Sequence, residues 1–154
     1  MKETSTKKGS TEEAEDAIAA SILRLRARSP FVGTLALFAK RKITRSVPTA
    51  ATDGKTLYFN PDFTDGLRRT ELDGLLAHEL LHSALRHPGR LQGRDPFRWN
   101  VAADVVVNGM IAEEDGLELP EGGVRDVELE KHQAEEVYEL LGKKNRMKPY
   151  EKFR

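Results

Sequence analysis

Residues 72–84 form the part of this sequence that most narrows the choice of fold. At about 100° per residue on a helix, their apolar side chains cover a broad arc made up of Leu72, Leu76, Ala77, Leu80, Leu81 and Ala84. A helix that is apolar over most of its surface is buried nearly all round. His78 and His82 share the rest of the circumference, and Glu79 lies beside them. The sequence therefore predicts a core helix over about residues 71–86 that carries two imidazoles and a carboxylate into the interior.

Local signals mark the ends of this helix and the start of the next one. The sequence TELD at residues 70–73 resembles a capping box with aspartate in place of glutamate, and His87-Pro88-Gly89 is typical of a helix end. Asp95 is a favourable N-cap and Pro96 a favoured first residue, so a second helix is predicted over residues 96–112. A polar stripe at four-residue spacing interrupts its apolar sequence and consists of Asn100, Asp104 and Asn108.

Further elements are predicted on either side of these two helices. An N-terminal helix is expected to begin at Thr11 and to end at Ser29-Pro30, because Ala14, Ile18, Ile22 and Leu25 recur at helical spacing. A last amphipathic helix is expected over residues 127–141, with Asp126 as its N-cap.

The region between residues 31 and 59 favours short extended pieces. These pieces are residues 34–38, the basic stretch 40–45, and residues 47–51 and 55–59. Asp53-Gly54 lies between the last two and predicts a hairpin. The order of one helix, a small mostly antiparallel sheet and then several helices indicates the α+β class.

The length and composition limit the organisation and the classes of partner. A chain of 154 residues is the size of one domain, so we expect a polar, flexible leader at residues 1–10, the domain at 11–142 and a basic tail at 143–154. The 25 basic residues equal the 25 acidic residues, which argues against a protein built around nucleic acid or an anionic membrane. No apolar run has the length of a signal peptide or a membrane span, so a soluble cytoplasmic protein is expected.

The pair His78 and His82 predicts a metal site. Residues at i and i+4 of a helix have Cβ atoms about 5–6 Å apart, so both imidazoles reach one metal ion. Because the chain has no cysteine, the ligands must be nitrogen and oxygen atoms. Glu79 lies about 100° further round the helix, where its carboxylate reaches a metal-activated water and can act as the general base of amide hydrolysis. The alternative is a hydrogen-bonded core cluster, but burying these three groups without a partner is costly, and a metal ion supplies that partner.

A catalytic zinc site with two histidines needs a third protein ligand, for which Asp104 and His87 are the candidates. His87 would need a sharp turn after His82 to come back to the metal, and no glycine lies between them. Asp104 lies among apolar residues of the next helix, where a carboxylate needs a cation or hydrogen-bond donors. Asp104 is therefore favoured, and His87 is the alternative metal ligand.

The remaining polar residues near the motif have weaker assignments. Asn100 and Asn108 share the stripe with Asp104 and are candidate hydrogen-bond partners that orient the ligands. Asn108 precedes Gly109, so it also fits a helix-end role. His132 lies on the polar side of the predicted last helix and is left out of the site.

Three stretches of the chain resemble a known family. They read VPTAATDGKTLYFNPDF, LAHELLHSALRHPGR and GRDPFRWNVAADVVVN. Together they resemble the bacterial family of metallopeptidase domains usually found N-terminal to a von Willebrand A-like domain, over about residues 14–141. The resemblance implies a zincin-like fold, in which the HExxH helix lies under a small sheet and a carboxylate on the following helix completes the metal site.

Carried onto this chain, the resemblance implies His78, His82 and Asp104 as metal ligands and Glu79 as the base. It also implies that residues 55–59 form an edge strand against which an extended peptide adds as a further strand. The expected protein is a zinc-dependent metallopeptidase of the zincin type, with Zn²⁺ as cofactor and a peptide or protein as substrate.

Two rival functions remain open at this point. One is a non-catalytic, zinc-stabilised binding or adaptor module that partners a separately encoded ATPase or A-domain protein. The other is a peptidase that acts on proteins bound to nucleic acid through the basic residues 40–45 and 143–154. The neutral net charge disfavours the second rival, because short charge runs are usually solvated surface.

Overall fold

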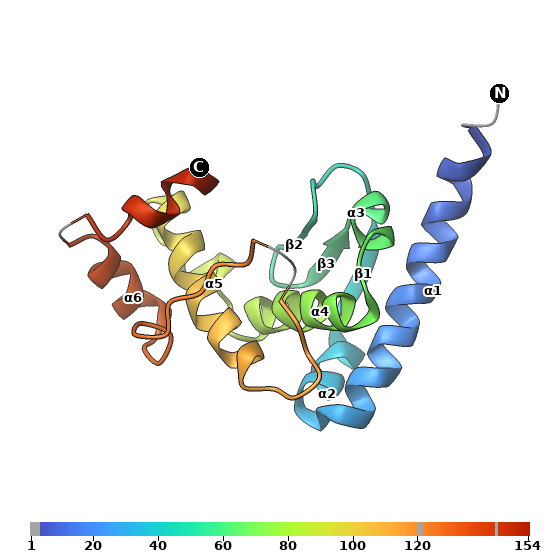
Figure 1. The fold of residues 1–154 in the computed structure, drawn as a ribbon, viewed down its shortest axis with the longest axis horizontal. Helices are drawn as coiled ribbons and strands as arrows, with labels where there is room; N and C mark the ends of the chain where they lie inside the picture. Colours follow the sequence, from blue (N-terminus) through green and yellow to red (C-terminus); the bar gives the residue numbers. More distant parts are fainter. Residues whose placement is uncertain (1–3, 120–121, 144) are drawn as a thin grey trace.

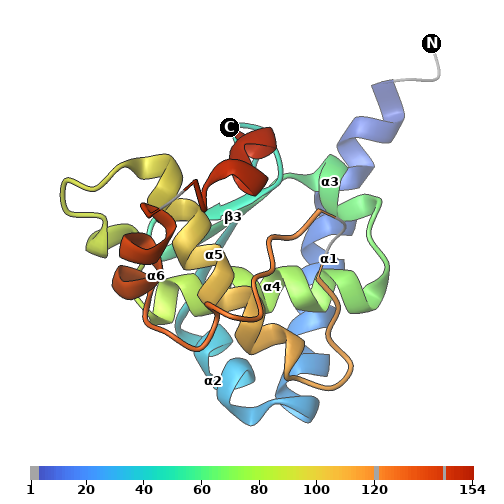
Figure 2. The same ribbon diagram turned by 60° about the vertical axis from the view of Figure 1, so that its left-hand side comes forward.

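Helices pack around a small sheet, with α4 near the centre of the molecule (Figure 1). The computed structural model describes residues 4–119, 122–143 and 145–154. The elements are α1 (Thr4–Arg28), α2 (Pro30–Phe38), β1 (Lys40–Ile43), β2 (Ala50–Thr52), β3 (Thr56–Phe59), α3 (Pro61–Asp65), α4 (Arg69–Ala84), η1 (Pro88–Arg90), α5 (Pro96–Ala112), α6 (Ala134–Leu141) and η2 (Lys148–Phe153). The segment between α5 and α6 passes back across α4 and α5 (Figure 2). The predicted α+β class is confirmed.

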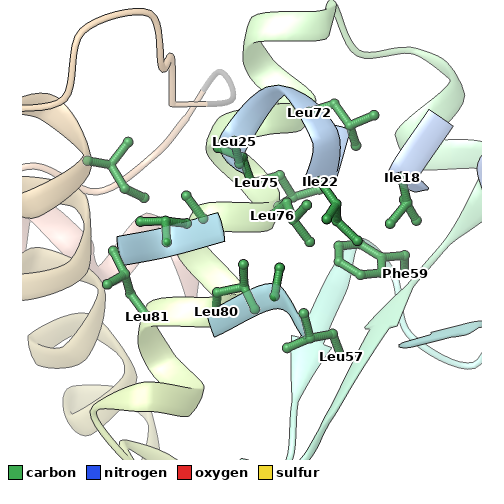
Figure 3. Close-up of a cluster of buried hydrophobic side chains, with 14 of the residues drawn as sticks. Ile18, Ile22, Leu25, Leu57, Phe59, Leu72, Leu75, Leu76, Leu80 and Leu81 are labelled. Carbon is green, nitrogen blue, oxygen red and sulfur yellow. The ribbon is translucent and has the colours of Figure 1, made fainter. Parts of the chain in front are cut away.

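The first hydrophobic cluster surrounds α4 (Figure 3). Its largest buried side chains come from α1, β3, α4 and α5 and include Ile18, Ile22, Leu25, Leu57, Phe59, Leu72, Leu75, Leu76, Leu80, Leu81 and Ile111. The α1 residues are those whose spacing predicted a core-facing helix. The prediction that α4 is buried over most of its circumference is confirmed, although Ala84 at its end is exposed.

The start of α4 differs from the predicted capping box. The backbone N–H of Arg68 donates to Glu71 Oε1 at 3.1 Å, so Glu71 closes the first turn. Asp73 is buried instead and accepts hydrogen bonds from Ser21 Oγ at 2.5 Å and from the Arg24 guanidinium at 2.7 Å. The predicted role of Asp73 as a cap is therefore wrong, because its carboxylate has charged and hydroxyl partners on α1 that fix α1 against α4.

The sheet has the strand order β1-β3-β2 and is mixed rather than mostly antiparallel. The predicted hairpin is confirmed: β2 pairs antiparallel with β3, and Gly54 in the turn has a φ of +98°. Strand β1 pairs parallel with β3, because the connection to β2 passes round the end of β3, where Thr44 N–H donates to Phe59 O and Asn60 N–H donates to Thr49 O. Residues 55–59 are therefore the central strand, and the predicted edge strand is wrong; β2 occupies the edge.

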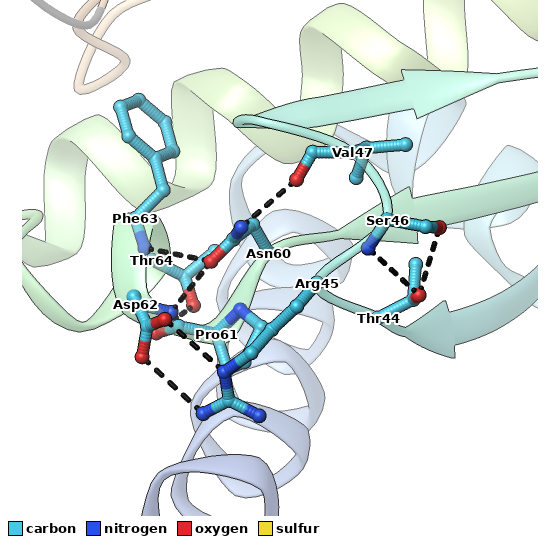
Figure 4. A network of polar contacts seen from close by, with 9 residues as sticks. All are labelled: Thr44, Arg45, Ser46, Val47, Asn60, Pro61, Asp62, Phe63 and Thr64. Atoms are coloured by element: carbon cyan, nitrogen blue, oxygen red, sulfur yellow. Dashed lines mark hydrogen bonds and ion pairs between the residues drawn. The ribbon is translucent and has the colours of Figure 1, made fainter. Parts of the chain in front are cut away.

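The side chain of Asn60 fixes this connection (Figure 4). Its Nδ2 donates to Val47 O at 2.8 Å, and its Oδ1 accepts from the N–H groups of Asp62 at 2.9 Å and Phe63 at 3.3 Å. Arg45 Nε donates to Asp62 Oδ2 at 3.1 Å in the same network. One side chain thus caps α3 and holds the loop that leads into β2.

Two predictions for the N-terminal region are wrong. Residues 34–38 are helical, within α2, because Pro30 starts a helix whose buried face contains Val32 and Ala36. Gly33 permits close packing on α1, since a Cβ at this position would lie 2.5 Å from the Cα of Arg26. Helix α1 begins at Thr4 rather than Thr11, so the helix continues through most of the predicted leader; no proline interrupts it there, and residues 1–3 lie outside the described residues.

A second hydrophobic cluster joins α5, α6 and the C-terminal segment, and its larger members are Trp99, Leu129, Val137, Tyr138, Leu141 and Tyr150. Helix α5 has the predicted bounds, and Asp95 caps it by accepting from Arg98 N–H at 2.9 Å. Helix α6 is shorter than predicted, because Asp126 caps only a turn, in which Leu129 N–H donates to it at 3.1 Å. Tyr150, in the predicted basic tail, is buried and donates to Asp126 Oδ2 at 3.1 Å, so the tail packs on the fold.

Among the described helices, none has both the length and the apolar character needed to cross a bilayer.

Candidate metal centre

Helices α4 and α5 bring three metal-ligating side chains together. His82 Nε2 lies 2.9 Å from His78 Nε2 and 2.9 Å from Asp104 Oδ1, and His78 Nε2 lies 3.3 Å from Asp104 Oδ1. Four-residue spacing aligns the histidines on α4, and Asp104 faces them from α5. We refer to these three atoms as the ligand triangle.

The dimensions and donor types of the ligand triangle fit a metal ion. Two imidazole nitrogens and a carboxylate oxygen form a set that zinc accepts, and tetrahedral zinc separates its ligand atoms by about 3.3 Å. The three side chains are the only group of at least three histidine, cysteine or acidic residues with this spacing in the described part of the chain. They are also the residues that the sequence predicted as ligands, with Asp104 favoured as the third.

The pKa values of the residues in the ligand triangle depend on one another. Burial lowers the pKa of His78, but the hydrogen bond and the charge of Asp104 outweigh this effect and raise it to about 9. Burial raises the pKa of Asp104, yet hydrogen bonds to His78 and His82 bring it below the usual range. The Asp104 side chain is 33% exposed, so it is a paired charge beside a cleft rather than the isolated buried charge that was expected.

Glu79 lies next to the triangle and is 6% exposed. Burial raises the pKa of its carboxyl group above the usual value, although the charges of His78 and His82 oppose this effect. Its side chain lines the same cleft as the triangle, and among the described residues it accepts no hydrogen bond. Glu79 is therefore a nearly buried carboxyl group with a raised pKa that lines the cleft and accepts no hydrogen bond from the described residues.

Of the two candidate partners on α5, the structure brings only Asn108 to the ligands. Its Oδ1 lies 2.7 Å from His78 Nδ1, and its Nδ2 donates to Val124 O at 2.7 Å. Asn108 is 2% exposed and so fixes the ring of His78 to the segment that follows α5. Asn100 is exposed on the cleft wall and has no hydrogen bond to a ligand in the described residues. His132, which was left out of the site, pairs with Glu136 on the surface.

His87 lies behind His82 rather than in the ligand triangle. Its Nδ1 is 2.9 Å from His82 Nδ1, the ring nitrogen that faces away from Asp104. Burial, and then the charges of His82 and Arg90, lower the pKa of His87 to about 3, so its imidazole is neutral and its Nδ1 can accept a hydrogen bond from His82 Nδ1–H. His87 is a hydrogen-bond partner of a candidate ligand, a role that the sequence did not predict.

The turn that places His87 uses a residue that sequence reasoning overlooked. Arg86 has a φ of +58°, in the left-handed region that favours glycine, and this reverses the chain directly after α4. The turn is held by hydrogen bonds from His87 N–H to His82 O at 3.0 Å and from Trp99 Nε1 to His87 O at 2.8 Å. No local sequence signal marks Arg86, because the Trp99 contact that stabilises the turn comes from the next helix.

The triangle and Glu79 open into a cleft of about 740 Å³. Its walls include β2 with Thr49, the facing sides of α4 and α5, and residues 122–124. Ser83 Oγ donates to Gly54 O at 2.8 Å and fixes the β2–β3 hairpin beside the end of α4. The cleft therefore brings together the ligand triangle, the Glu79 carboxylate and β2, one edge strand of the sheet.

Comparison with known proteins places these residues in a family context. Neither the curated proteins nor the solved structures give a significant match to the chain. One family model, described as "Putative metallopeptidase domain", matches residues 11–151 and so covers the sheet, the ligand triangle and Glu79. The match also includes Tyr150, in agreement with the packing of the C-terminal segment on the fold. The chain belongs to this metallopeptidase domain family.

Proposed function

We propose that the protein is a zinc-dependent metallopeptidase of the zincin type that hydrolyses peptide bonds. The observation that carries the proposal is the ligand triangle of His78, His82 and Asp104 in one cleft with Glu79. The Glu79 carboxylate accepts no hydrogen bond from the described residues. Family membership supports the same reaction class.

Each residue has a definite part in the proposed reaction. His78, His82 and Asp104 hold the ion, while Asn108 and His87 keep the two rings in orientation. A bound zinc ion supplies a Lewis acid that lowers the pKa of a water molecule to about 7 and polarises the peptide carbonyl. Glu79 accepts the proton of the attacking water and delivers it to the leaving amine. Burial raises the pKa of Glu79, which makes its carboxylate a stronger base than an exposed glutamate.

The substrate backbone is proposed to pair with the edge of β2. This strand is paired on one side with β3, and no strand covers its other side in the described residues. Backbone groups of an extended peptide supply the missing hydrogen bonds when it adds to such an edge. The peptide-binding role expected of residues 55–59 thus passes to β2, which lines the cleft.

The test is metal analysis of the purified chain together with digestion of an unbiased peptide library. We expect one zinc ion per chain, cleavage that stops on chelation, and recovery when zinc is added. Bound zinc without cleavage would favour the adaptor module that partners an ATPase or A-domain protein. Absence of bound metal under saturating zinc would overturn both functions.

Metal binding is expected to release a proton and to tighten as the pH rises. His78 has a raised pKa of about 9 in the metal-free chain, so it is protonated near pH 7, whereas a metal ligand must be deprotonated. The apparent zinc affinity should rise about tenfold per pH unit below this pKa and level off above it. Calorimetric titrations in buffers of different ionisation enthalpy count the released proton, and an affinity independent of pH across this range would contradict the prediction.

Replacement of His87 is expected to weaken metal binding although His87 is not a ligand. His87→Ala removes the acceptor 2.9 Å from His82 Nδ1, and losing such an outer partner typically costs about 10–100-fold in metal affinity. His87→Asn offers Oδ1 near the position of the lost Nδ1 and should restore most of the affinity. The surface variant His132→Ala serves as the control. Equal zinc affinity in His87→Ala and wild type, measured by competition with a chelating dye, would remove His87 from this role.

A further inference from the structure

The cleft is uncharged outside the candidate metal centre. Apart from His78, Glu79, His82, His87 and Asp104, none of the described residues that line it is ionisable. Much of the wall is apolar and includes Phe63, Leu75, Leu91, Phe97, Leu119 and Val124. The chain has 32% charged residues, yet the described lining of this cleft has no acidic or basic side chain outside the candidate metal centre.

The apolar residues lie on both sides of the ligand triangle. Leu75 lies three residues before His78 on α4. Asn108 forms hydrogen bonds with both His78 and Val124 O, so Val124 lies near the same histidine. We refer to Leu75, Leu119 and Val124 as the His78-side wall. At the other end, Leu91 follows His87 and Phe97 lies two helical turns before Asp104. Leu91, Phe97 and Phe153 form the His82-side wall. The triangle therefore lies between two apolar surfaces.

Strand β2 leads from one wall towards the other. Its start pairs with Phe59, and its end leads into Gly54, which Ser83 fixes beside the end of α4. Because β2, His78 and His82 line one cleft and the turn after β2 is fixed at the end of α4, a peptide paired with β2 would pass the two histidines. At about 3.3 Å per residue, a few residues of such a peptide extend beyond the triangle in each direction.

We propose that the substrates are extended peptide segments with apolar, uncharged side chains on both sides of the cleaved bond. This inference rests on the proposed function and names its substrate class. Moving an apolar side chain from water to these apolar walls lowers its free energy. A charged side chain there loses its hydration, and none of the described lining residues outside the candidate metal centre offers it an opposite charge. Folded proteins bury most of their apolar segments, so the expected protein substrates are unfolded or have an exposed apolar stretch.

The experiment compares peptides of equal length that differ only beside a central bond, where they carry leucine, glutamate or lysine. We expect the zinc-loaded chain to cleave the leucine peptide with a kcat/KM at least about tenfold above the charged ones. Binding is followed separately through the fluorescence of Trp99, the only tryptophan of the chain, which lines the cleft. Tighter binding of the leucine peptide is expected there too.

The two measurements separate failure of the inference from failure of the proposed function. If no peptide is cleaved but the leucine peptide binds best, the peptidase function fails and the apolar preference stands. Equal binding and equal cleavage of all three peptides, or a preference for charge, overturns the inference alone.

Variants of the two walls localise the preference. Leu119→Lys changes the His78-side wall and Leu91→Lys the His82-side wall, and each places a positive charge at a half-buried position. Each variant should shift the glutamate-to-leucine ratio of kcat/KM by at least about tenfold, on opposite sides of the cleaved bond. Val127→Lys, at a position that is 67% exposed and outside the cleft, is the control and should leave the ratio unchanged. Unaltered ratios in both wall variants would show that these surfaces do not contact the substrate.

Discussion

Glu79→Gln is expected to abolish peptide hydrolysis while the metal stays bound. Glutamine has nearly the same shape but cannot accept the proton of the attacking water, and loss of a general base typically costs about 10²–10⁴-fold in rate. Folding should be preserved, because burial already disfavours the charged form of Glu79 and a neutral side chain avoids this cost. The measurement is kcat/KM on a cleaved library peptide, with zinc content determined on the same sample.

A matched control for this prediction is Glu136→Gln. Glu136 is an exposed glutamate of α6 that pairs with His132 away from the cleft, so its replacement should leave kcat/KM within about twofold of wild type. A Glu79→Gln protein with full zinc content and near-normal turnover would exclude Glu79 as the base.

Asp104→Ala is expected to cause the largest loss of metal. The substitution removes one of three ligand atoms, so the affinity should fall by more than the about 100-fold upper value for an outer partner such as His87. It also removes the group that raises the pKa of His78, so His78 should titrate at lower pH in the metal-free variant. Zinc stoichiometry after dialysis and a chemical-shift titration of the histidines measure the two effects.

Asn100→Ala separates the ligand role from a general effect on α5. Asn100 lies one turn before Asp104 and lines the same cleft, but it does not contact the ligands. We expect Asn100→Ala to bind zinc as wild type does. Full zinc retention in Asp104→Ala would contradict the assignment of Asp104 as a metal ligand. His87 would then be the alternative third ligand.

The helices that carry the site could be predicted because their signals are local. The spacing of His78 and His82 places them on one face of any α-helix, and Asp95-Pro96 marks the start of α5. The proximity of Asp104 to the histidines is a tertiary contact. The sequence prediction of Asp104 rested on the cost of leaving a carboxylate unpaired in an apolar helix, although the side chain is in fact partly exposed.

The predictions that failed concern features decided by distant contacts. The apolar residues of α2 suit a strand or a helix, and packing against α1 selects the helix. The sheet order depends on the path of the chain round the end of β3, which Asn60 holds through Val47. Arg86 takes a left-handed conformation that costs about 1–2 kcal/mol without glycine, and the hydrogen bonds that His87 forms with His82 and Trp99 help to offset this cost.

The ligand triangle lies where the two hydrophobic clusters meet. Both histidines stand on α4, in the first cluster, whereas Asp104 lies on α5 between Trp99 of the second cluster and Val107 of the first. A metal ion held there would link α4 to α5 where the two clusters meet, in addition to the contacts that α5 makes in both clusters. The free energy of metal binding would then stabilise the packing of the two clusters against each other, so removal of the metal should lower the temperature at which the chain unfolds.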